Sequence, residues 1–331
     1  MNRRTSLQLC PAALMWPGWL AAQPARRFRV GCLWVTNETA VKPFRDAFLA
    51  GMREYGYVAG RNLALDERYA EGDVSRLPVL ADELITLKPD VLIGIESAVA
   101  VLRRRTTTIP LVLIAGVNPV AAGLMQSLSR PGTNVTGLSF RQDELIAKHI
   151  ELLAEINPRI TRIALFQFAA VADEPWASIA ALYEQYARKA ASAKGLTLVI
   201  VTARDAQGVR RAFERLGEEQ AEGLVVAASG FTWQLRNEII RETRRLKIPS
   251  ITSNPQEWAD SGGLATYGPS FLHNYRRVAT YVDRIFKGAK PAELPIEEMA
   301  KFEFVVDLRT AREIGVTIPQ VLLFRADRVI E

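Results

Sequence analysis

From residue 28 onward, the sequence alternates short continuous apolar runs with longer segments whose apolar residues recur every three to four positions. The short runs are typical of strands buried on both faces of a sheet, and the longer segments are typical of helices that cover it. This alternation is the pattern of β-α-β units, so it predicts parallel sheets between layers of helices. The expected strands are residues 28–35, 62–69, 90–95, 111–115, 135–140, 160–166, 196–201, 223–227, 248–252 and 302–306.

A helix expected at residues 143–156 separates two such series of strands and helices. The chain has 331 residues, which is about the length of two domains. We therefore expect an α/β protein with two open parallel sheets, each covered by helices. After the last expected strand, the sequence predicts a short helix and an irregular end.

The first 25 residues differ from the rest and have the layout of a secretory signal peptide. Arg3 and Arg4 give a basic start, a mostly apolar stretch follows, and small residues precede a plausible cleavage point. Pro11 and Pro17 interrupt the apolar stretch, which argues against both a buried helix and a membrane span. We therefore expect residues 1–25 to be a signal peptide that is removed on export.

The composition disfavours several classes of function. The formal net charge is +6 at pH 7, but basic and acidic residues are interspersed, and the Arg103–Arg105 run lies in an expected helix as a solvated face. We expect no nucleic-acid partner. The sequence has two cysteines and two histidines with no metal-ligand spacing, and no nucleotide-binding glycine motif or nucleophile elbow. No metal, cofactor or catalytic residue is therefore expected, and Cys32 should be a buried free thiol.

Candidate binding residues follow the expected strands, because ligands of open α/β sheets bind beyond the carboxyl ends of the strands. With two such units, the cleft between them is the default site. These residues carry hydroxyl, amide, carboxylate and aromatic groups, but no imidazole, thiol or amine, so they suit binding better than catalysis. They are Trp34, Asn37, Glu96, Ser97, Asn118, Ser139, Phe168, Asp173, Trp176, Ser229, Phe231, Ser253 and Asn254.

Simpler roles stay open for these residues. The alternative for Ser97, Ser229 and Asn254 is to cap the helices that begin there. The alternative for the tryptophans is packing within one domain, and the alternative for Glu96 is exposure to solvent. A site is expected because many such residues follow the strands, not because of any one position.

Short motifs also occur in a specific order along the chain. They are GMREYGYVAGRN at 51–62, AEG at 70–72, RLP at 76–78, TTIP at 107–110, NPV at 118–120, SLSRPGTNVTGLS at 127–139, YGP at 267–269, GAKP at 288–291 and KFE at 301–303. In this order, over residues 28–331, they resemble the ABC-transporter substrate-binding protein family that includes tryptophan-binding members.

The resemblance implies a type I periplasmic binding protein, in which two Rossmann-like lobes with parallel sheets are joined by a multi-crossing hinge, as in a Venus flytrap. Lobe one would comprise residues 26–140 plus about 267–300, and lobe two residues 141–266 plus about 301–331. The crossings would lie near 139–142, 264–268 and 301–307. Such a protein would be periplasmic, act as a monomer, and deliver an amino acid or similar small molecule to an ABC permease.

The resemblance also implies roles in the cleft. Ser97 and nearby backbone N–H groups would bind an anionic end of the ligand, and Glu96 or Asp173 a cationic end. Trp34, Phe168, Trp176 and Phe231 would line the apolar part.

Three stretches facing the expected cleft depart from the family pattern. Ile95-Glu96-Ser97 replaces Gly-Thr-Pro, Asn118 replaces Asp, and Gln167-Phe168 replaces Asn-Pro. These departures bear on which ligand is bound, and they leave the expected fold unchanged. Two alternatives stay open: a detached binding subunit that feeds a sensor or regulator, and a cytosolic α/β enzyme with a misread start.

Overall fold

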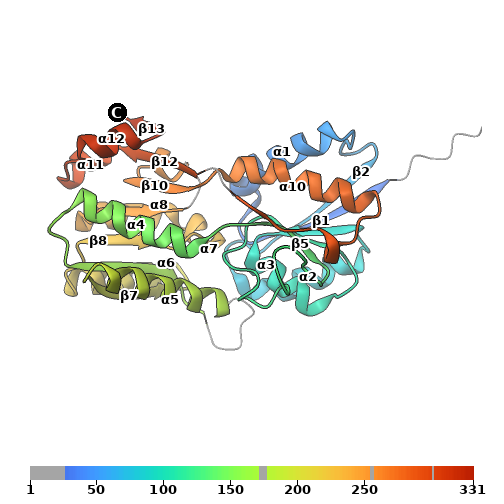
Figure 1. Cartoon of the computed structure of the whole chain (residues 1–331), viewed down its shortest axis with the longest axis horizontal. Helices are drawn as coiled ribbons and strands as arrows, with labels where there is room; N and C mark the ends of the chain where they lie inside the picture. Colours follow the sequence, from blue (N-terminus) through green and yellow to red (C-terminus); the bar gives the residue numbers. More distant parts are fainter. Residues whose placement is uncertain (1–26, 171–176, 254–256, 300–301) are drawn as a thin grey trace, which may run out of the picture.

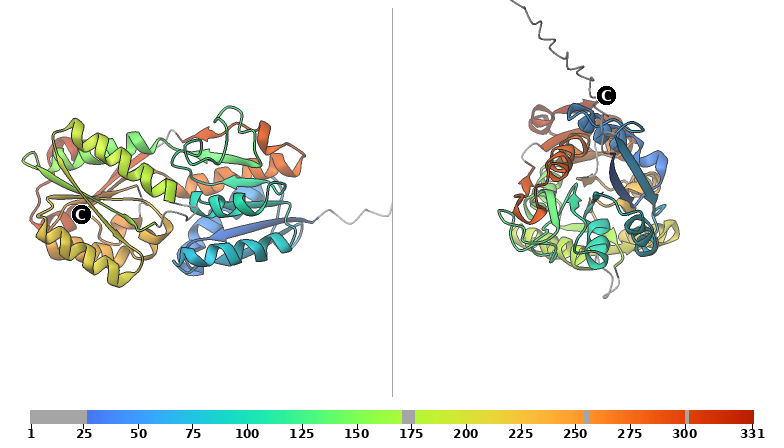
Figure 2. Two further views of the ribbon diagram at one scale, coloured as in Figure 1. Left: turned by 90° about the horizontal axis from the view of Figure 1, so that it is seen from below. Right: turned by 90° about the vertical axis from the view of Figure 1, so that its right-hand side faces the viewer.

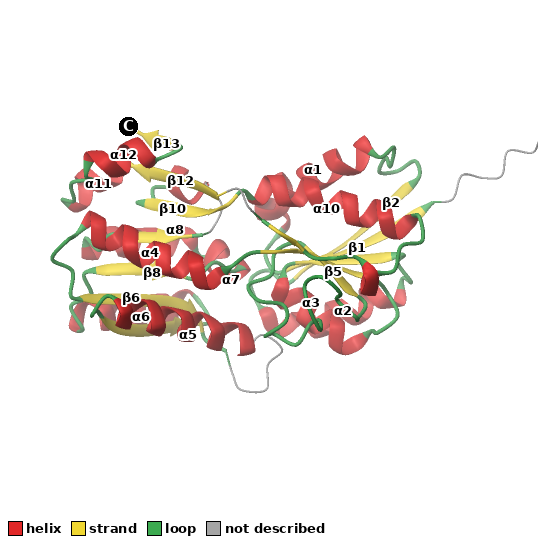
Figure 3. Ribbon diagram, viewed as in Figure 1, coloured by secondary structure: helices red, strands yellow, loops and turns green. Residues whose placement is uncertain are grey.

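The computed structural model describes residues 27–170, 177–253, 257–299 and 302–331, which form two α/β lobes side by side (Figure 1). The expected signal peptide at residues 1–25 lies outside the described residues. Each lobe contains one sheet, drawn in yellow, between red helices (Figure 3). Among the described helices, none is long and apolar enough to cross a membrane.

Lobe one is built mainly from the first series of strands and helices. It comprises β1 (Phe28–Trp34), α1 (Glu38–Glu54), β2 (Leu63–Tyr69), the 3-10 helix η1 (Val74–Arg76), α2 (Leu77–Thr86), β3 (Val91–Gly94), α3 (Glu96–Arg105), β4 (Leu111–Leu113), β5 (Val135–Ser139), α10 (Phe271–Phe286), η2 (Pro291–Glu293) and β11 (Glu297–Glu298). Every strand pair in this sheet is parallel, as predicted.

Lobe two contains the second series. It comprises α4 (Gln142–Ile156), β6 (Arg162–Phe168), α5 (Ala177–Ala193), β7 (Thr197–Ala203), α6 (Ala206–Glu218), β8 (Gly223–Val226), α7 (Gly230–Gln234), α8 (Arg236–Leu246), β9 (Ser250–Thr252), α9 (Glu257–Asp260), β10 (Ala265–Pro269), β12 (Phe302–Asp307), α11 (Leu308–Ile314), α12 (Gln320–Arg325) and β13 (Arg328–Ile330).

Three details differ from the predictions. Residues 265–269 form the strand β10 within lobe two, so the second crossing follows residue 269 rather than lying near 264–268. Strand β12 pairs with β10 in the antiparallel direction, which makes this sheet mixed. The expected irregular end contains β13, which pairs with β12. A strand of three residues carries too little periodicity to be recognised in a sequence.

The two sheets repeat one topology. Their strand orders are β11-β5-β4-β3-β1-β2 and β13-β12-β10-β9-β8-β6-β7. In each lobe the second strand of the chain lies at one edge of the sheet, beside the first strand. The third and later strands lie on the other side of the first strand. The switch points of the two sheets therefore lie between β1 and β3 in lobe one and between β6 and β8 in lobe two. Ligands of open α/β sheets bind at such points.

Side chains of the central strands alternate between two apolar layers, and Figure 2 shows helices on both faces of each sheet. In lobe one, Val30 and Cys32 pack toward α1 and α10, whereas Leu33 packs toward α2 and α3. In lobe two, Phe166 faces α6 and α8, whereas Leu165 faces α4 and α5. Cys32 is a buried free thiol, as predicted.

The lobes are joined at β5–α4, β10–α10 and β11–β12. The first connection lies between Ser139 and Gln142, and the second between Pro269 and Phe271. The third includes residues 300 and 301, which lie outside the described part. Through α10, a helix from the second half of the chain packs on α1 and completes lobe one.

Candidate functional site

A cavity of about 160 Å³ lies between the lobes, where the two switch points face each other. Lobe one contributes residues after β1, β3, β4 and β5, together with side chains of α1 and α10. Lobe two contributes the end of β6, one face of α5, and the residues from the end of β8 into α7. The fold alone therefore explains why residues so distant in the sequence share one cavity.

Aromatic rings from both lobes form much of the wall. In lobe one, the ring of Tyr275 lies 5.8 Å from Trp34 and stacks at 5.1 Å on Phe44. Phe44 in turn meets Trp233 of lobe two edge to face at 6.1 Å. Elsewhere on the lobe two wall, Phe168 and Phe231 make an edge-to-face contact at 5.1 Å. These rings favour a ligand with an apolar or aromatic body.

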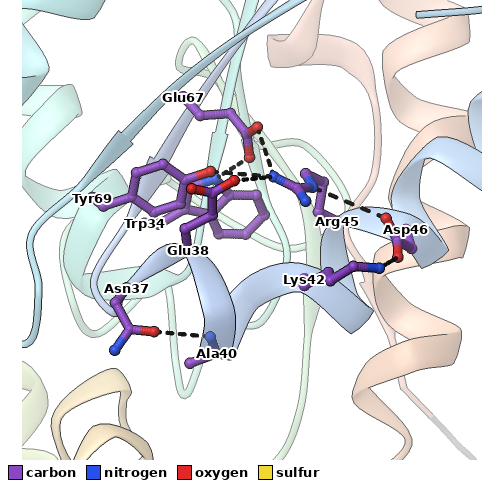
Figure 4. A network of polar contacts seen from close by, with 9 residues as sticks. All are labelled: Trp34, Asn37, Glu38, Ala40, Lys42, Arg45, Asp46, Glu67 and Tyr69. Atoms are coloured by element: carbon purple, nitrogen blue, oxygen red, sulfur yellow. Dashed lines mark hydrogen bonds and ion pairs between the residues drawn. The ribbon is translucent and has the colours of Figure 1, made fainter.

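The indole of Trp34 is held in place by a network of charged groups (Figure 4). Its Nε1–H donates to Glu67 Oε1 at 2.8 Å, and the other oxygen of Glu67 pairs with Arg45 at 3.4 Å. Arg45 also contacts Glu38 at 3.3 Å and the Tyr69 hydroxyl at 3.5 Å. Because these contacts fix the orientation of the Trp34 indole, its ring presents a preformed surface to the cavity.

Glu96 is the first residue of α3 and places a carboxyl group in the cavity wall, with 4% of the residue exposed. Its Oε2 accepts from the backbone N–H of Val117 at 2.8 Å, and the backbone N–H of Asn118 also interacts with the carboxyl group. Its Oε1 is buried and has no partner among the described residues. Burial raises the pKa of Glu96 to about 7, although the two backbone hydrogen bonds act in the opposite direction.

Two more polar atoms of the lining are buried without a described partner. They are Oε1 of Gln167, at the end of β6, and Nε1 of Trp233, in α7. Across from Glu96, Tyr183 of α5 donates its hydroxyl to the Ala228 carbonyl at 3.0 Å. Burial, and secondarily the charge of Glu96, raise the pKa of Tyr183 well above its usual value, so its hydroxyl stays protonated.

The start of α7 brings the lobes into close contact. Ser229 caps this helix, accepting from the Thr232 N–H at 3.1 Å, so its hydroxyl has the capping role that the sequence left open. The next residue, Gly230, lies so near lobe one that an added Cβ would be 2.6 Å from Val35. A glycine here allows the start of α7 to approach the Val35 side chain of lobe one.

Asn37 and Asn118 each form a hydrogen bond between the lobes outside the cavity lining. Asn37 Nδ2 donates to Gln234 Oε1 at 3.3 Å, while Asn37 Oδ1 caps α1 by accepting from the Ala40 N–H. Asn118 Nδ2 donates to the Tyr186 hydroxyl at 3.0 Å. The structure therefore has its two lobes in contact around the cavity, with two of the predicted amides used at the rim.

The predicted site residues fall into four groups. Six line the cavity: Trp34, Glu96, Ser97, Phe168, Ser229 and Phe231. Two bridge the lobes at its rim, Asn37 and Asn118. Two are buried but do not line it, Ser139 and Ser253. The remaining three, Asp173, Trp176 and Asn254, lie outside the described residues.

Many further residues line the cavity without being among the thirteen candidates; those with polar or aromatic side chains include Phe44, Gln167, Tyr183 and Tyr275. Phe44, Tyr183 and Tyr275 lie within helices, where an aromatic residue in an apolar stripe is indistinguishable from core. Gln167 had a usable signal, because it is a polar residue at the end of an otherwise apolar strand.

The chemistry of the lining suits recognition of a small molecule. The residues of the described lining include one carboxyl group, two tyrosine hydroxyls and several serine, threonine and amide groups, with no lysine, arginine or histidine. Within the described ranges, no group of three or more metal-ligating side chains occurs. The cavity can surround an apolar body and offer hydrogen bonds from either lobe.

Comparison with known proteins gives a consistent result. A family described as ABC transporter substrate binding protein matches residues 29–330. A tyrosine-binding protein from Clostridioides difficile strain R20291 is 22% identical over 291 residues, which cover 86% of this chain and 79% of that relative.

Solved structures share the fold. The crystal structure of a conserved domain protein from Vibrio cholerae is 26% identical, with a TM-score of 0.83, over 92% of this chain and 100% of that chain. The structure of an ABC domain from Streptococcus pneumoniae in complex with L-Trp is 22% identical, with a TM-score of 0.80 and the same coverage.

Proposed function

Because the chain belongs to the ABC transporter substrate-binding protein family, we propose that it is the extracytoplasmic binding subunit of an ABC importer. In this role it captures an amino acid or similar small molecule between its lobes and presents the closed form to a membrane permease. The proposed location is the periplasm, after removal of the expected signal peptide, and the proposed active form is a monomer.

The observation that carries this proposal is a cavity whose wall is shared between the two lobes. A ligand enclosed there touches both lobes at once, so it favours the closed arrangement by its additional contacts. Closure is a hinge motion at the three connections, of which residues 139–142 and 269–271 are described. The permease then distinguishes loaded from empty protein by the relative position of the lobes.

The ligand class follows from the size and lining of the cavity. A cavity of about 160 Å³ is close to the roughly 150 Å³ of an engineered apolar cavity that holds benzene. The rings of Trp34, Phe44 and Tyr275 on one side, and of Phe231 and Trp233 on the other, suit a ring-containing ligand. The similar proteins described above, one named tyrosine-binding and one solved with L-Trp, support the same class.

Thermal unfolding of the purified protein against amino acids, aromatic amines, aromatic acids and sugars tests the proposal. A ligand at about 100 times its dissociation constant adds roughly 2.7 kcal/mol to the free energy of unfolding. For a chain of this size the midpoint should rise by a few degrees. We expect a rise with at least one ring-containing compound and none with sugars.

The same experiment separates the proposal from the alternatives. A protein that no compound in the panel stabilises would contradict capture of a small molecule in the cleft. Loss of uptake of the bound compound on deletion of the gene would support import, whereas unchanged uptake would favour a detached subunit that feeds a sensor.

A further inference from the structure

We propose that the cleft is selective for primary arylalkylamines, which carry a protonated nitrogen and no carboxylate, and that Glu96 sets this selectivity. The inference rests on the proposed binding function and narrows its ligand class. Its basis is the hydrogen bonding of one buried carboxyl group, Glu96, and the absence of cationic side chains from the described lining around it.

Backbone N–H groups that could bind a ligand carboxylate already bind the carboxyl group of Glu96. Oε2 of Glu96 accepts from the backbone N–H of Val117, and the backbone N–H of Asn118 also stabilises the ionised carboxyl group. Glu96 also occupies the first position of α3, where the partial positive charge of the helix N-terminus already faces its carboxyl group. A ligand needs no acid group to satisfy these donors.

The other oxygen of Glu96 requires a donor from the ligand. Its Oε1 is buried and unpartnered among the described residues, and so is Oε1 of Gln167 on the opposite wall. A buried acceptor without a donor costs free energy, so a ligand that supplies hydrogens here gains affinity. A primary ammonium group has three N–H donors, so it can donate to Glu96 Oε1 and still has donors left for a second acceptor of the lining.

A ligand carboxylate has no matching charge. The described lining contains no lysine, arginine or histidine, and its one acidic group is Glu96. An acid in this cavity would be buried without a cation and beside another carboxylate, which is costly on both counts. An amine instead pairs with Glu96 and is surrounded by rings whose faces attract cations.

The ionisation of Glu96 gives the inference a pH signature. The group facing it from lobe two is the hydroxyl of Tyr183 on α5, which stays protonated, and the groups from its own lobe are the backbone amides of Val117 and Asn118. With a pKa of about 7, Glu96 must lose its proton before it pairs with an ammonium. Amine affinity should therefore rise with pH from 5 to 7 and level off above 7.

The test is a titration calorimetry series of matched pairs with the purified protein at pH 8. The pairs are tryptamine with L-tryptophan, tyramine with L-tyrosine and phenethylamine with L-phenylalanine. We expect at least one amine to bind at least 10-fold more tightly than its amino acid, because burial of an unpaired charge disfavours the acid. For that amine, affinity should fall about 10-fold for each pH unit below 7.

A conservative variant tests whether Glu96 is responsible. Glu96→Gln keeps an oxygen acceptor and the shape of the side chain but removes the charge, so amine affinity should fall roughly 10- to 100-fold and lose its pH dependence. Binding of indole, which has no ammonium group, should change little. Glu242→Gln is the matched control, because Glu242 is also buried but pairs with Arg245 away from the cavity.

The outcomes separate this inference from the proposed function. Equal or tighter binding of the amino acids would overturn the amine selectivity and leave the capture of small molecules intact. Amine binding that Glu96→Gln leaves unchanged would overturn the role of Glu96. Binding of neither group, together with silence across the wider panel, would overturn both proposals.

Discussion

The two lobes use the same topological position in different ways. In lobe one, the helix after the third strand of its sheet begins with Glu96, and its N-cap, Ile95, provides no side-chain hydrogen bond. In lobe two, the corresponding helix begins with Gly230, and its N-cap, Ser229, forms a full capping box. One lobe therefore places a partly satisfied acid in the cavity, and the other offers a satisfied helix start with no side chain in the way.

The cavity-lining tryptophans of the two lobes also differ in whether their indole N–H groups have a hydrogen-bond partner. Trp34 donates its indole N–H to Glu67, which is itself paired with Arg45. The indole N–H of Trp233 is buried without a described partner, although the Arg236 guanidinium lies 4.4 Å from its ring. Lobe one therefore presents a more rigidly held binding surface, whereas lobe two has donors and acceptors that a ligand can satisfy when the lobes close.

The largest expected effect comes from the carboxyl group of Glu96, which the start of α3 carries and the start of α7 lacks. Folding raises the pKa of Glu96 from 4.5 to about 7, so its contribution to stability is complete below pH 4.5 and is lost as pH rises through 7. We expect Glu96→Gln to remove this loss, which amounts to about 3 kcal/mol of the free energy of unfolding. Urea unfolding at pH 5 and pH 8 with saturating indole, which fills the cavity without supplying an ammonium group, measures it.

Ser229→Ala, at the corresponding position of lobe two, is the control for this pH effect. Loss of the cap should cost about 1 kcal/mol at both pH values. If the difference between Glu96→Gln and the parent protein were independent of pH, Glu96 would be hydrated even with the cavity filled, which would contradict its burial in the closed form.

Gly230→Ala tests the close approach of the lobes. Its Cβ would lie 2.6 Å from Val35, so full closure would require one lobe to shift. Overpacking of this kind costs about 1–3 kcal/mol, so ligand affinity should fall roughly 10- to 100-fold. Because the conflict exists only between lobes, the unfolding midpoint of the ligand-free protein should change little.

Gly217→Ala is the matched control for Gly230→Ala, because a Cβ there would meet Leu246 at an ordinary 3.7 Å within lobe two. Its ligand affinity should equal that of the parent protein. Unchanged affinity in Gly230→Ala as well would mean that the binding form is more open than the structure.

The same substitution in the two tryptophans sharpens the comparison. Trp34→Phe leaves an oxygen of the partly buried Glu67 without its donor, which should cost about 1–3 kcal/mol beyond the loss of packing. Trp233→Phe removes a donor that has no described partner, so no described acceptor loses its donor and this additional loss of stability is absent. Urea unfolding should find Trp34→Phe the less stable variant, and equal losses would contradict a preformed surface in lobe one.

The fold was largely predictable because alternating apolar runs report buried strands and amphipathic helices directly. The site was predictable where a residue type is unusual for its position, as with Glu96 in place of the neutral Gly-Thr-Pro loop of the family pattern and Trp34 at a strand end. Helix-borne Phe44 and Tyr275 were not, because their sequence spacing is that of core residues whether or not a ligand touches them.

Two predicted serines show where the strand-end argument fails. Ser139 is the last residue of β5 and Ser253 directly follows β9; they are 2% and 1% exposed, but neither lines the cavity. Phe140, one residue after Ser139, does line it. Successive side chains of a strand point to opposite faces, so a placement that is wrong by one residue selects the wrong side. The sequence identifies which strand ends face the cleft more reliably than which residue of each does.

The smallest expected effect is at the rim, where Tyr186→Phe removes the hydrogen bond from Asn118 that crosses between the lobes. A single neutral hydrogen bond contributes about 0.5–1.5 kcal/mol, so ligand affinity should fall about 2- to 10-fold. Tyr281→Phe is the control, because the Tyr281 hydroxyl donates to the Pro295 carbonyl within lobe one. That variant should unfold more readily yet bind ligand with unchanged affinity. If both variants lost stability and neither lost affinity, the bond between Asn118 and Tyr186 would be as permanent as a bond within a lobe, and closure would depend on the cavity contacts alone.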